Sequence, residues 1–307
     1  MKLKKPNFWD YKRPNIISNL LYPFSKIVSL ISSSKKNGIK INGITTICVG
    51  NIYIGGTGKT SLAIEIKKIL DDKKVKSCFI KKYYKDQIDE QKLLQQHGDV
   101  IIDNSRLKAL QIAFGKGYEI AIFDDGLQDD AINYDFSIVC FNKKNLFGNG
   151  RVIPAGPLRE NLNNIKKYKN IFLIGNDEKL ANKILSKFTE TNLFEASYRP
   201  LNLHEFKNQK YIVFSGIGNH HTFIDMLKKN NLEVIKDYEF PDHYDYKKNE
   251  IEDIINESVS KDSKVLTTEK DYLRLPIEFN KEIKPIKIRL YIDKNNELKK
   301  LLDEITL

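Results

Sequence analysis

The sequence predicts an α/β protein: a mostly parallel sheet with helices on both faces, plus a second, smaller α/β domain. Short β-branched runs alternate with helical stretches from residue 44 onward, which is the pattern of strand–helix–strand units. A second series of such runs begins near residue 192. The 307 residues provide enough chain for two moderate domains, each with its own core. We therefore expect a larger domain at 39–197 and a smaller one at 198–307.

Strands can be placed in both series, with helical stretches between several of them. In the first, we expect strands at 45–49, 75–80, 100–102, 119–123 and 136–141, with helices at 59–70, 89–96 and 105–114. In the second, we expect strands at 210–214, 232–234, 264–266 and 286–290. The regular alternation in the first series favours a sheet whose strands all run in one direction.

Residues 1–38 form a separate segment, attached to the first domain. An apolar stripe recurs at three- and four-residue steps, which predicts one face of a helix. Its members are Ile16, Ile17, Leu20, Leu21, Phe24, Ile27, Val28 and Ile31. Flanking lysines and aromatic residues suit a helix that lies in a membrane interface, and a helix packed on its own domain is the alternative. Pro23 predicts a kink or a break within the stripe.

Composition narrows the class of protein without identifying it. The chain is 41% hydrophobic and 30% charged, as in soluble globular proteins, and its formal net charge is +11. That charge fits either a solvated lysine-rich surface or an anionic partner. Cys48, Cys78 and Cys140 are widely spaced in apolar runs, so we expect buried thiols and no disulfide framework.

A glycine-rich loop joins the first predicted strand to the first predicted helix of this series. It reads Gly50-Asn51-Ile52-Tyr53-Ile54-Gly55-Gly56-Thr57-Gly58-Lys59-Thr60. In such a phosphate loop the backbone N–H groups and the helix N-terminus surround a phosphate. We expect Lys59 to reach the β- and γ-phosphates of ATP and the Thr60 hydroxyl to ligate Mg²⁺. Tyr53 departs from the general pattern, which has glycine six residues before the lysine. The residues predicted to bind ATP are Gly55, Gly56, Thr57, Gly58, Lys59, Thr60 and Ser61.

A magnesium site of this kind also uses a carboxylate at the end of a neighbouring strand. The apolar run 119–123 ends in Asp124-Asp125-Gly126, which is the expected position. The sequence leaves open which of Asp124 and Asp125 contacts the metal. The loop and these carboxylates together predict an enzyme that uses ATP and Mg²⁺, most simply a kinase.

Other classes of protein use the same phosphate cradle. One is a nucleotide hydrolase that acts as a switch or a metallochaperone, and another is a nucleic-acid-binding ATPase. The segment Asn142-Lys143-Lys144-Asn145 resembles a guanine-reading motif but lacks its essential aspartate. The sequence shows neither a clustered Cys/His metal motif nor a helicase motif set. We therefore expect no nucleic-acid partner, and we keep the switch or metallochaperone as the alternative to a kinase.

Longer motifs carry a resemblance to a known family. In chain order they are Gly-Asn-x-x-x-Gly-Gly-Thr-Gly-Lys-Thr (50–60), Asp-Asp-Gly-Leu-Gln (124–128), Phe-Gly-Asn-Gly-Arg-Val-Ile-Pro-Ala-Gly-Pro-Leu-Arg-Glu (147–160), Phe-Ser-Gly-Ile-Gly-Asn (214–219), Phe-Pro-Asp-His (240–243) and Thr-Glu-Lys-Asp (268–271). Over nearly its whole length the chain resembles the tetraacyldisaccharide 4'-kinase family. The family's form of the phosphate loop also accounts for the residue at Tyr53.

The resemblance implies a reaction and a location. It implies transfer of the γ-phosphate of ATP to the 4'-hydroxyl of a tetraacyldisaccharide 1-phosphate, a step of lipid A biosynthesis. The partners it implies are this glycolipid and an anionic membrane surface, with the enzyme peripheral on the cytoplasmic face of the bacterial inner membrane. The segment 7–36 is similar to the family's membrane-associating helix. We expect a monomer.

The resemblance also assigns roles to individual residues. It implies that Asp89 is the catalytic base and that His243 supports it, with Asp242 helping to orient the imidazole. Without the resemblance, Asp89 is simply a carboxylate in the first turn of a helix, where the helix dipole favours it. Arg106 and Arg159 are candidates for contact with phosphate or substrate.

Three departures from the family pattern bear on substrate contacts. A Ser-Arg-Gly-Tyr-Gly segment is replaced by Lys81-Lys82-Tyr83-Tyr84-Lys85, so one of these lysines can supply the charge of the lost arginine. Asp129 stands where the family has a histidine, and the arginine-rich motif after the N-terminal helix is reduced at residues 34–38.

Overall fold

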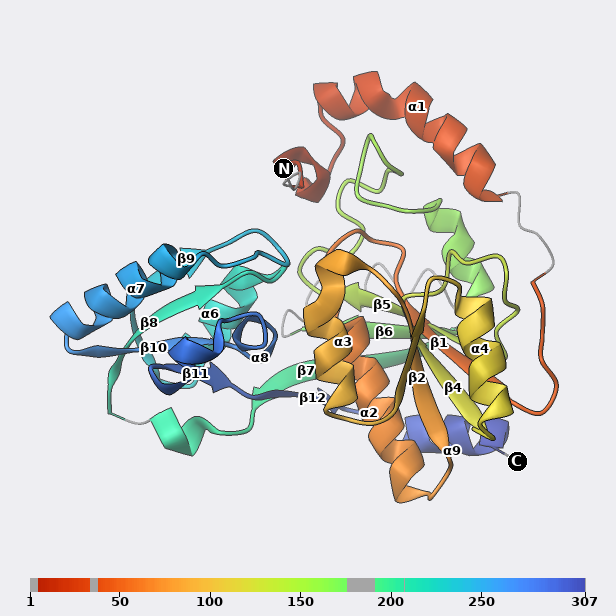
Figure 1. Cartoon of the computed structure of the whole chain (residues 1–307). Coiled ribbons are helices and arrows are strands. Elements are labelled where there is room, and N and C mark those ends of the chain that lie inside the picture. The colour runs from red at the N-terminus through yellow and green to blue at the C-terminus, as the bar shows by residue number, and fades with distance from the viewer. Residues whose placement is uncertain (1–4, 34–37, 176–190, 207, 307) are drawn as a thin grey trace. The chain divides into compact units, whose positions relative to one another are not determined.

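The structure, a computed structural model, describes residues 5–33, 38–175, 191–206 and 208–306. It divides into two compact units, whose elements are labelled in Figure 1. The larger unit comprises Leu3–Tyr83, His97–Tyr198 and Leu290–Leu307, and the smaller one comprises chiefly Tyr84–Gln96 and Arg199–Arg289. The predicted α/β fold with mostly parallel sheets is confirmed.

An eight-stranded sheet runs through the larger unit in the order β12-β7-β6-β5-β1-β4-β2-β3. Pairing is parallel from β3 through to β7. Its strands are β1 (Thr45–Gly50), β2 (Ser77–Lys82), β3 (Val100–Asp103), β4 (Ile120–Asp124), β5 (Phe136–Asn142), β6 (Asn170–Ile174), β7 (Asn192–Pro200) and β12 (Ile288–Ile292). Because parallel strands end at the same edge, the sequence that follows β1, β2 and β4 is brought to one place.

Both faces of this sheet are covered, as its sequence pattern requires. The helix α4 (Arg106–Gly115) packs on one face, in a core cluster that also contains Cys48, Cys78 and Phe123. Ile47 and Val49 alternate with Cys48 along β1 and are equally buried, so the opposite face is covered too. The helix α2 (Lys59–Asp72) contacts β1, β2 and β4, and α9 (Asn295–Thr306) ends the chain.

Two strands of this sheet, β6 and β7, were not predicted from the sequence. β6 is short and fully buried, and the nine-residue β7 alternates buried with partly exposed positions. The residues on either side of β6 and β7 are rich in asparagine and lysine, and they obscure the strand pattern in the sequence. The two strands are defined by their parallel pairing, in which β6 pairs with β5 and β7 pairs with β6.

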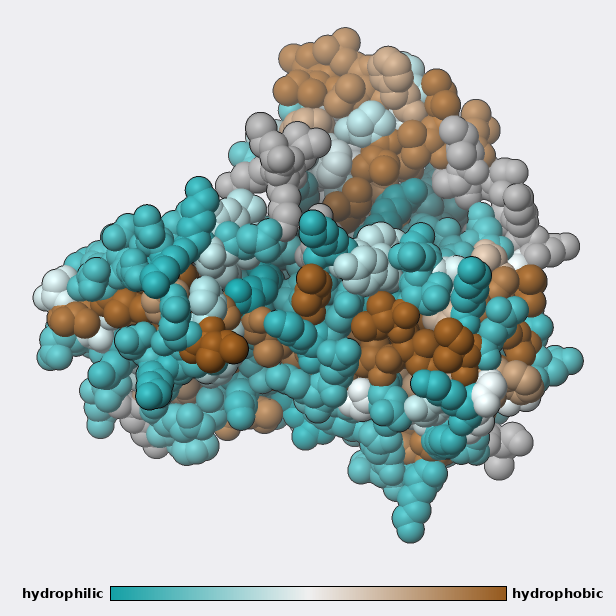
Figure 2. Space-filling view, in the orientation of Figure 1, coloured by the Kyte–Doolittle hydropathy of each residue, from teal (hydrophilic) through white to brown (hydrophobic). Residues whose placement is uncertain are grey.

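The N-terminal segment consists of a 3-10 turn (Asn7–Asp10) and the helix α1 (Ile16–Ser33). The helix is continuous through Pro23, so the chain does not break there. The reduced motif at residues 34–38 falls largely outside the described part of the chain. Figure 2 shows apolar side chains gathered along α1.

A four-stranded parallel sheet, in the order β11-β10-β8-β9, forms the centre of the smaller unit. Its core includes Ile212, Phe214, Ile251 and Val265. The elements of this unit are α3 (Ile88–Gln95), β8 (Lys210–Ser215), α6 (His220–Lys229), β9 (Glu233–Glu239), α7 (Lys248–Ser260), β10 (Ser263–Thr268), α8 (Glu269–Tyr272) and β11 (Ile283–Ile286), with 3-10 turns at Lys85–Gln87, Leu203–Phe206 and Ile277–Lys281.

The two units are not separated by the single boundary between residues 197 and 198 that the sequence predicts. The change after Tyr198 agrees with the sequence, but α3 belongs to the smaller unit, where it contacts α8. The last residues, from Leu290 on, return to the larger unit. Neither of these two assignments is visible in the sequence, because each depends on contacts between residues far apart in the chain. The assignment of α3 places Asp89 in the same unit as His243.

Candidate active site

The phosphate loop follows β1 and ends at the first residue of α2, as predicted. Gly58 precedes the helix with φ of 84°, a left-handed conformation that favours glycine. A Cβ atom there would also lie 2.6 Å from the Tyr198 hydroxyl and 2.8 Å from Ile174. Backbone conformation and lack of space therefore both require glycine at this position.

Asn51 braces the loop from inside, a role that the sequence analysis did not assign. Its side chain is fully buried, and its Nδ2 donates to the Tyr53 carbonyl at 2.6 Å and to Thr57 Oγ1 at 2.9 Å. A third contact, to the Gly55 carbonyl, measures 3.3 Å. The asparagine at this place in the motif is the signal that could have identified it. These hydrogen bonds of the amide hold the loop curved.

Tyr53 is a structural residue of the loop. Tyr53 is 2% exposed, and its hydroxyl contacts Asp10 and accepts a hydrogen bond from Lys5 Nζ at 2.8 Å. The adjoining backbone pairs with the 157–159 segment, where Ile54 N donates to the Pro157 carbonyl. An aromatic residue at this position thus fastens the loop to the N-terminal segment instead of approaching a ligand.

Asp124 is the last residue of β4 and is completely buried. Its Oδ2 accepts hydrogen bonds from Lys81 Nζ at 2.7 Å and from Thr60 Oγ1 at 3.1 Å. Its Oδ1 is buried and has no hydrogen-bond partner among the described residues. The side chain therefore joins the end of β4 to the first turn of α2 and leaves one oxygen unused.

Asp125 lies next to two basic residues of the same site, Arg159 and Lys59. It has φ of 60°, an uncommon conformation for a residue with a side chain. Arg159 Nη1 lies 2.8 Å and 2.9 Å from its two oxygens, and Lys59 Nζ lies 3.8 Å from Oδ2. Burial opposes its negative charge, but Lys59 and Arg159 outweigh burial and hold the pKa of Asp125 below its usual value. The carboxylate is therefore ionised at neutral pH.

The second predicted arginine has a different neighbour. Arg106, the first residue of α4, is 8% exposed, and its Nη1 lies 3.1 Å from Asp129 Oδ2. Its Nη2 donates to the Asp125 carbonyl. Asp129 thus forms an ion pair with Arg106. Arg106 in turn fixes the backbone of the loop at Asp125.

The donors in this cluster fit a magnesium ion that also binds phosphate. Mg²⁺ takes oxygen ligands, usually one or two from the protein together with phosphate and water oxygens. Thr60 supplies a hydroxyl, and Asp124 Oδ1 is the buried oxygen without a partner. Asp125 has both oxygens engaged by Arg159. This geometry favours Asp124 over Asp125 as the direct ligand.

A second cluster of ionisable groups lies in the smaller unit. Asp89, in the first turn of α3, is 2% exposed, and its Oδ1 lies 3.1 Å from His243 Nδ1. The two residues are 154 positions apart, so the structure brings together the pair that the resemblance implied. His243 has φ of 55° and follows the end of β9. Asp242 Oδ1 lies 3.8 Å from His243 Nε2, which is too long for a hydrogen bond.

Arg274 holds the other oxygen of Asp89, a contact that the sequence analysis missed. Its Nη2 lies 3.0 Å from Asp89 Oδ2, and its Nη1 lies 3.3 Å from Asp271 Oδ1. Burial opposes the charge on Asp89, but the hydrogen bond with His243 and the charge of Arg274 hold its pKa below its usual value. Arg274 follows the Thr-Glu-Lys-Asp motif by three residues, and that proximity is the signal in the sequence.

A chain of Ser215, His220 and Asp237 resembles a hydrolase triad but lacks its geometry. Ser215 Oγ lies 2.7 Å from His220 Nδ1, and His220 Nε2 lies 2.8 Å from Asp237 Oδ2. Ser215 is completely buried, and the two ring nitrogens are exchanged relative to a triad. These contacts fasten α6 to β8 and β9.

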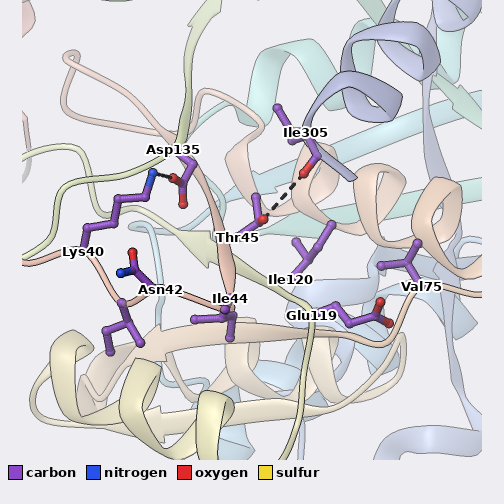
Figure 3. Close-up of a pocket in the computed structure, with 11 residues that line it drawn as sticks. Lys40, Asn42, Ile44, Thr45, Val75, Glu119, Ile120, Asp135 and Ile305 are labelled. Carbon is purple, nitrogen blue, oxygen red and sulfur yellow. Dashed lines mark hydrogen bonds and ion pairs between the residues drawn. The ribbon is translucent and has the colours of Figure 1, made fainter. Parts of the chain in front are cut away.

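A cavity of about 420 Å³ lies at the opposite edge of the large sheet, at the amino ends of β1 and β4. Figure 3 shows Lys40 and Asp135 facing each other there, with Nζ 2.5 Å from Oδ1, and the Thr45 hydroxyl directed to the Ile305 carbonyl. Ligands of parallel α/β sheets bind at the carboxyl ends of the strands. This cavity is therefore separate from the phosphate loop.

Comparison with known proteins gives a consistent result. The family model described as tetraacyldisaccharide-1-P 4'-kinase matches residues 17–306. A tetraacyldisaccharide 4'-kinase of Pelagibacter ubique (strain HTCC1062) is 52% identical over 98% of this chain and 98% of its own length. The enzyme of the same description from Rickettsia canadensis (strain McKiel) is 32% identical over 97% and 96%.

A solved structure shows the same fold. The crystal structure of LpxK from Aquifex aeolicus in complex with ATP covers 95% of this chain and 100% of its own, with a TM-score of 0.74 and 24% identity. With the family model and the relatives, this likeness leads to one conclusion: the chain belongs to the tetraacyldisaccharide-1-phosphate 4'-kinase family.

Proposed function

We propose that this protein transfers the γ-phosphoryl group of ATP to the 4'-hydroxyl of a tetraacyldisaccharide 1-phosphate, a step of lipid A biosynthesis. The observation that carries the proposal is the phosphate-loop cluster of Lys59, Thr60, Asp124 and Asp125, in a chain whose whole length matches kinases of this description. No observation favours a switch or a metallochaperone.

On the phosphate side, Lys59 and the backbone N–H groups of residues 55–61 bind the phosphates and stabilise the charge on the transferred group. The acceptor oxygen bonds to the γ-phosphorus as the bond to the bridging oxygen breaks, and ADP leaves. Arg159 is fixed by Asp125 beside Lys59 and adds positive charge. Positioning and electrostatics supply most of the rate acceleration.

Mg²⁺ belongs to the same proposal. Thr60 Oγ1 and Asp124 Oδ1 would hold it, and it would supply charge neutralisation on the phosphate oxygens. Asp125 acts differently, because it orients Arg159 and faces Lys59.

On the acceptor side, the Asp89–His243 pair takes the proton of the 4'-hydroxyl. We assign Asp89 as the base and His243 as the group that orients it and shares the proton. Arg274 and His243 each hold one oxygen of the carboxylate, so its position and its ionised state are both fixed. Asp242, near His243 Nε2, is a candidate for a contact with the sugar.

The helix α1 supports contact with a lipid surface. Two of its serines face inward: Ser18 Oγ donates to the Ala155 carbonyl at 2.7 Å, and Ser25 Oγ donates to the Val152 carbonyl at 2.7 Å. Many of its large apolar side chains are exposed, including Ile16 at 79%, Leu20 at 71% and Leu30 at 71%, whereas Val28 packs against the core. A helix that packs only on its own domain buries its apolar face, so this reversed orientation favours an interfacial helix.

We extend the proposal to a monomer that is peripheral on the cytoplasmic face of the inner membrane, where an acylated substrate and ATP are both accessible. No helix of the described residues is long and apolar enough to cross a membrane.

Incubation of the purified protein with γ-labelled ATP and an acylated glucosamine disaccharide 1-phosphate tests the reaction. Label in the lipid, at the 4'-position after chemical degradation, is the expected result. Release of free phosphate without labelled lipid would contradict the proposal and would favour the hydrolase alternative.

A further inference from the structure

Lys81 is a buried lysine inside the phosphate-loop cluster. It is 2% exposed near the end of β2, and its Nζ lies 2.7 Å from Oδ2 of the fully buried Asp124. The parallel register of β2 and β4 pairs Ile80 with Phe123, so the following residues of the two strands meet at the edge where the phosphate loop lies. The position of Lys81 is therefore fixed by the sheet and not by a mobile loop.

Three lysines occupy the segment that differs from the family pattern, and the structure separates them. Lys81, at the place of the pattern's serine, is buried against Asp124, whereas Lys85 is exposed and Lys82 is partly exposed. The contact with Asp124 places the charge of Lys81 within the phosphate-loop cluster. Lys81 is therefore a positive charge fixed beside Asp124.

Stability alone does not explain the buried ion pair between Lys81 and Asp124. Removing two charges from water costs several kcal/mol per ion, and an apolar pair of similar volume often serves a fold equally well. Asp124 nevertheless keeps Oδ1 without a partner in the described structure, although it is completely buried. This arrangement leaves the carboxylate half satisfied, as suits a group that gains its last partner from a ligand.

We propose that Lys81 is a nucleotide-site residue that acts as a fixed counter-cation: it holds Asp124 through Oδ2, reserves Oδ1 for the metal, and attracts the phosphates of ATP when the metal is absent. The inference rests on the proposed function, because it takes residues 55–61 as the ATP site. Lys81 is a positioning residue for Asp124 and a source of charge at the phosphates.

The charges involved give a specific consequence. Metal-free ATP carries about four negative charges, whereas Mg²⁺-bound ATP carries about two, so a fixed lysine attracts the metal-free form more strongly. The same positive charge opposes the binding of Mg²⁺ next to Asp124. Lys81 should therefore reduce the difference between ATP affinity with magnesium and ATP affinity without it.

Nucleotide binding with and without magnesium tests this inference independently of turnover. The Kd of a fluorescent ATP analogue is measured in EDTA and in saturating Mg²⁺ for the native protein, Lys81→Met and Lys81→Arg. For Lys81→Met we expect the Kd in EDTA to rise about tenfold, with a smaller change in Mg²⁺. Lys81→Arg, which keeps the charge, should lie close to the native ratio. An unchanged ratio in Lys81→Met overturns the proposal.

Lys67 provides a matched control. It is also a buried lysine, 6% exposed, but it pairs with Asp71 within α2. Lys67→Met should alter stability without altering the ratio of the two Kd values. If it alters the ratio as much as Lys81→Met does, the effect is general and the assignment of Lys81 fails.

Loss of one member of a buried pair can prevent folding, so a second comparison is included. Asp124→Asn leaves Lys81 in place, and Lys81→Met with Asp124→Asn removes both charges without leaving either unpaired. Metal-free ATP should bind about tenfold more weakly to the double variant than to Asp124→Asn, and equal affinity overturns the inference. If ATP binds without any dependence on Lys59, the proposed phosphate site itself fails, which is a different result.

Discussion

The phosphate-loop cluster and the Asp89 cluster differ in how the chain assembles them. The first takes its loop from residues 50–60 and adds side chains from the ends of adjacent parallel strands. The second joins Asp89 to His243 across 154 positions and adds Arg274 across 185. Phosphate binding depends largely on backbone N–H groups, which a short segment can supply. Activation of a hydroxyl depends on side chains held at fixed positions relative to one another, and these positions are set by tertiary packing.

The two clusters also treat their carboxylates differently. Asp89 has both oxygens held, by His243 and by Arg274, whereas Asp124 has one oxygen held and one unpaired in the described structure. The first arrangement suits a fixed base, and the second suits a group that completes its coordination with a ligand. Variants in each cluster should therefore separate binding from chemistry.

The largest effect is expected at the phosphate loop. Lys59→Ala removes the cation that we propose to face the transferred phosphoryl group, so transfer to the lipid should fall by about a thousandfold or more. Weaker ATP binding should accompany this loss. Labelled lipid product and the Kd of ATP are the two measurements, and Lys67→Met is the control. Native turnover in Lys59→Ala would falsify the assignment of the loop.

The acceptor cluster should show the opposite division between binding and chemistry. Asp89→Asn keeps the shape of the side chain but removes the proposed base, so kcat should fall by about 10²- to 10⁴-fold while the Kd of ATP stays within about twofold. The exposed Asp253→Asn on α7 serves as the control in the same unit. A loss of ATP binding equal to that of Lys59→Ala would remove the distinction between the clusters.

A smaller effect is expected from the apolar face of α1. Leu20→Asp with Ile27→Asp places charge on two exposed apolar positions, so association with anionic lipid vesicles should weaken by about tenfold or more. ATP binding should be unchanged. Val259→Asp changes an equally exposed apolar residue, 74% exposed, on α7. Vesicle sedimentation distinguishes them, and equal losses in both variants would show that α1 has no special role.

The smallest effect is a change in pH dependence. Arg274 helps to hold the pKa of Asp89 below its usual value, so Arg274→Met should raise that pKa and move the acid limb of the kcat profile to higher pH. The sign follows because only the ionised carboxylate acts as a base, and its charge is lost as pH falls through the pKa. At neutral pH the loss should be about fivefold or less.

Arg274→Lys keeps the positive charge and should leave the acid limb near its native position. Thermal unfolding of both variants shows whether the fold is retained, because Arg274 also contacts Asp271. An acid limb that stays in place in Arg274→Met would mean that Arg274 does not act through Asp89.

Several parts of the fold were predictable because their signals are local. The strand before the phosphate loop, the loop and the helix from Lys59 were placed within a few residues of their observed bounds. Cys48, Cys78 and Cys140 are buried and free, as expected from their apolar surroundings. β6 and β7 were missed because the asparagine- and lysine-rich residues around them obscure the apolar run of β6 and the alternation of β7.

The candidate site shows the same limit. Lys59, Thr60 and Asp124 lie together because a phosphate loop and the end of a neighbouring strand always meet at one edge of a parallel sheet. Arg106 pairs with Asp129 in the structure, and its contact with phosphate or substrate stays a prediction. Nothing in the local sequence specifies that pairing.

The sequence by itself determined the α/β class, the phosphate loop and the family resemblance, since these depend on glycine conformation, alternating strands and helices, and motifs of contiguous residues. The tertiary structure decided that α3 joins the smaller unit, that Asn51 and Arg274 brace the two clusters, and that Lys81 is buried against Asp124. The physical reason is that a buried charge must find its partner in space. Neighbours in space are set by strand order and packing, whatever their separation along the chain.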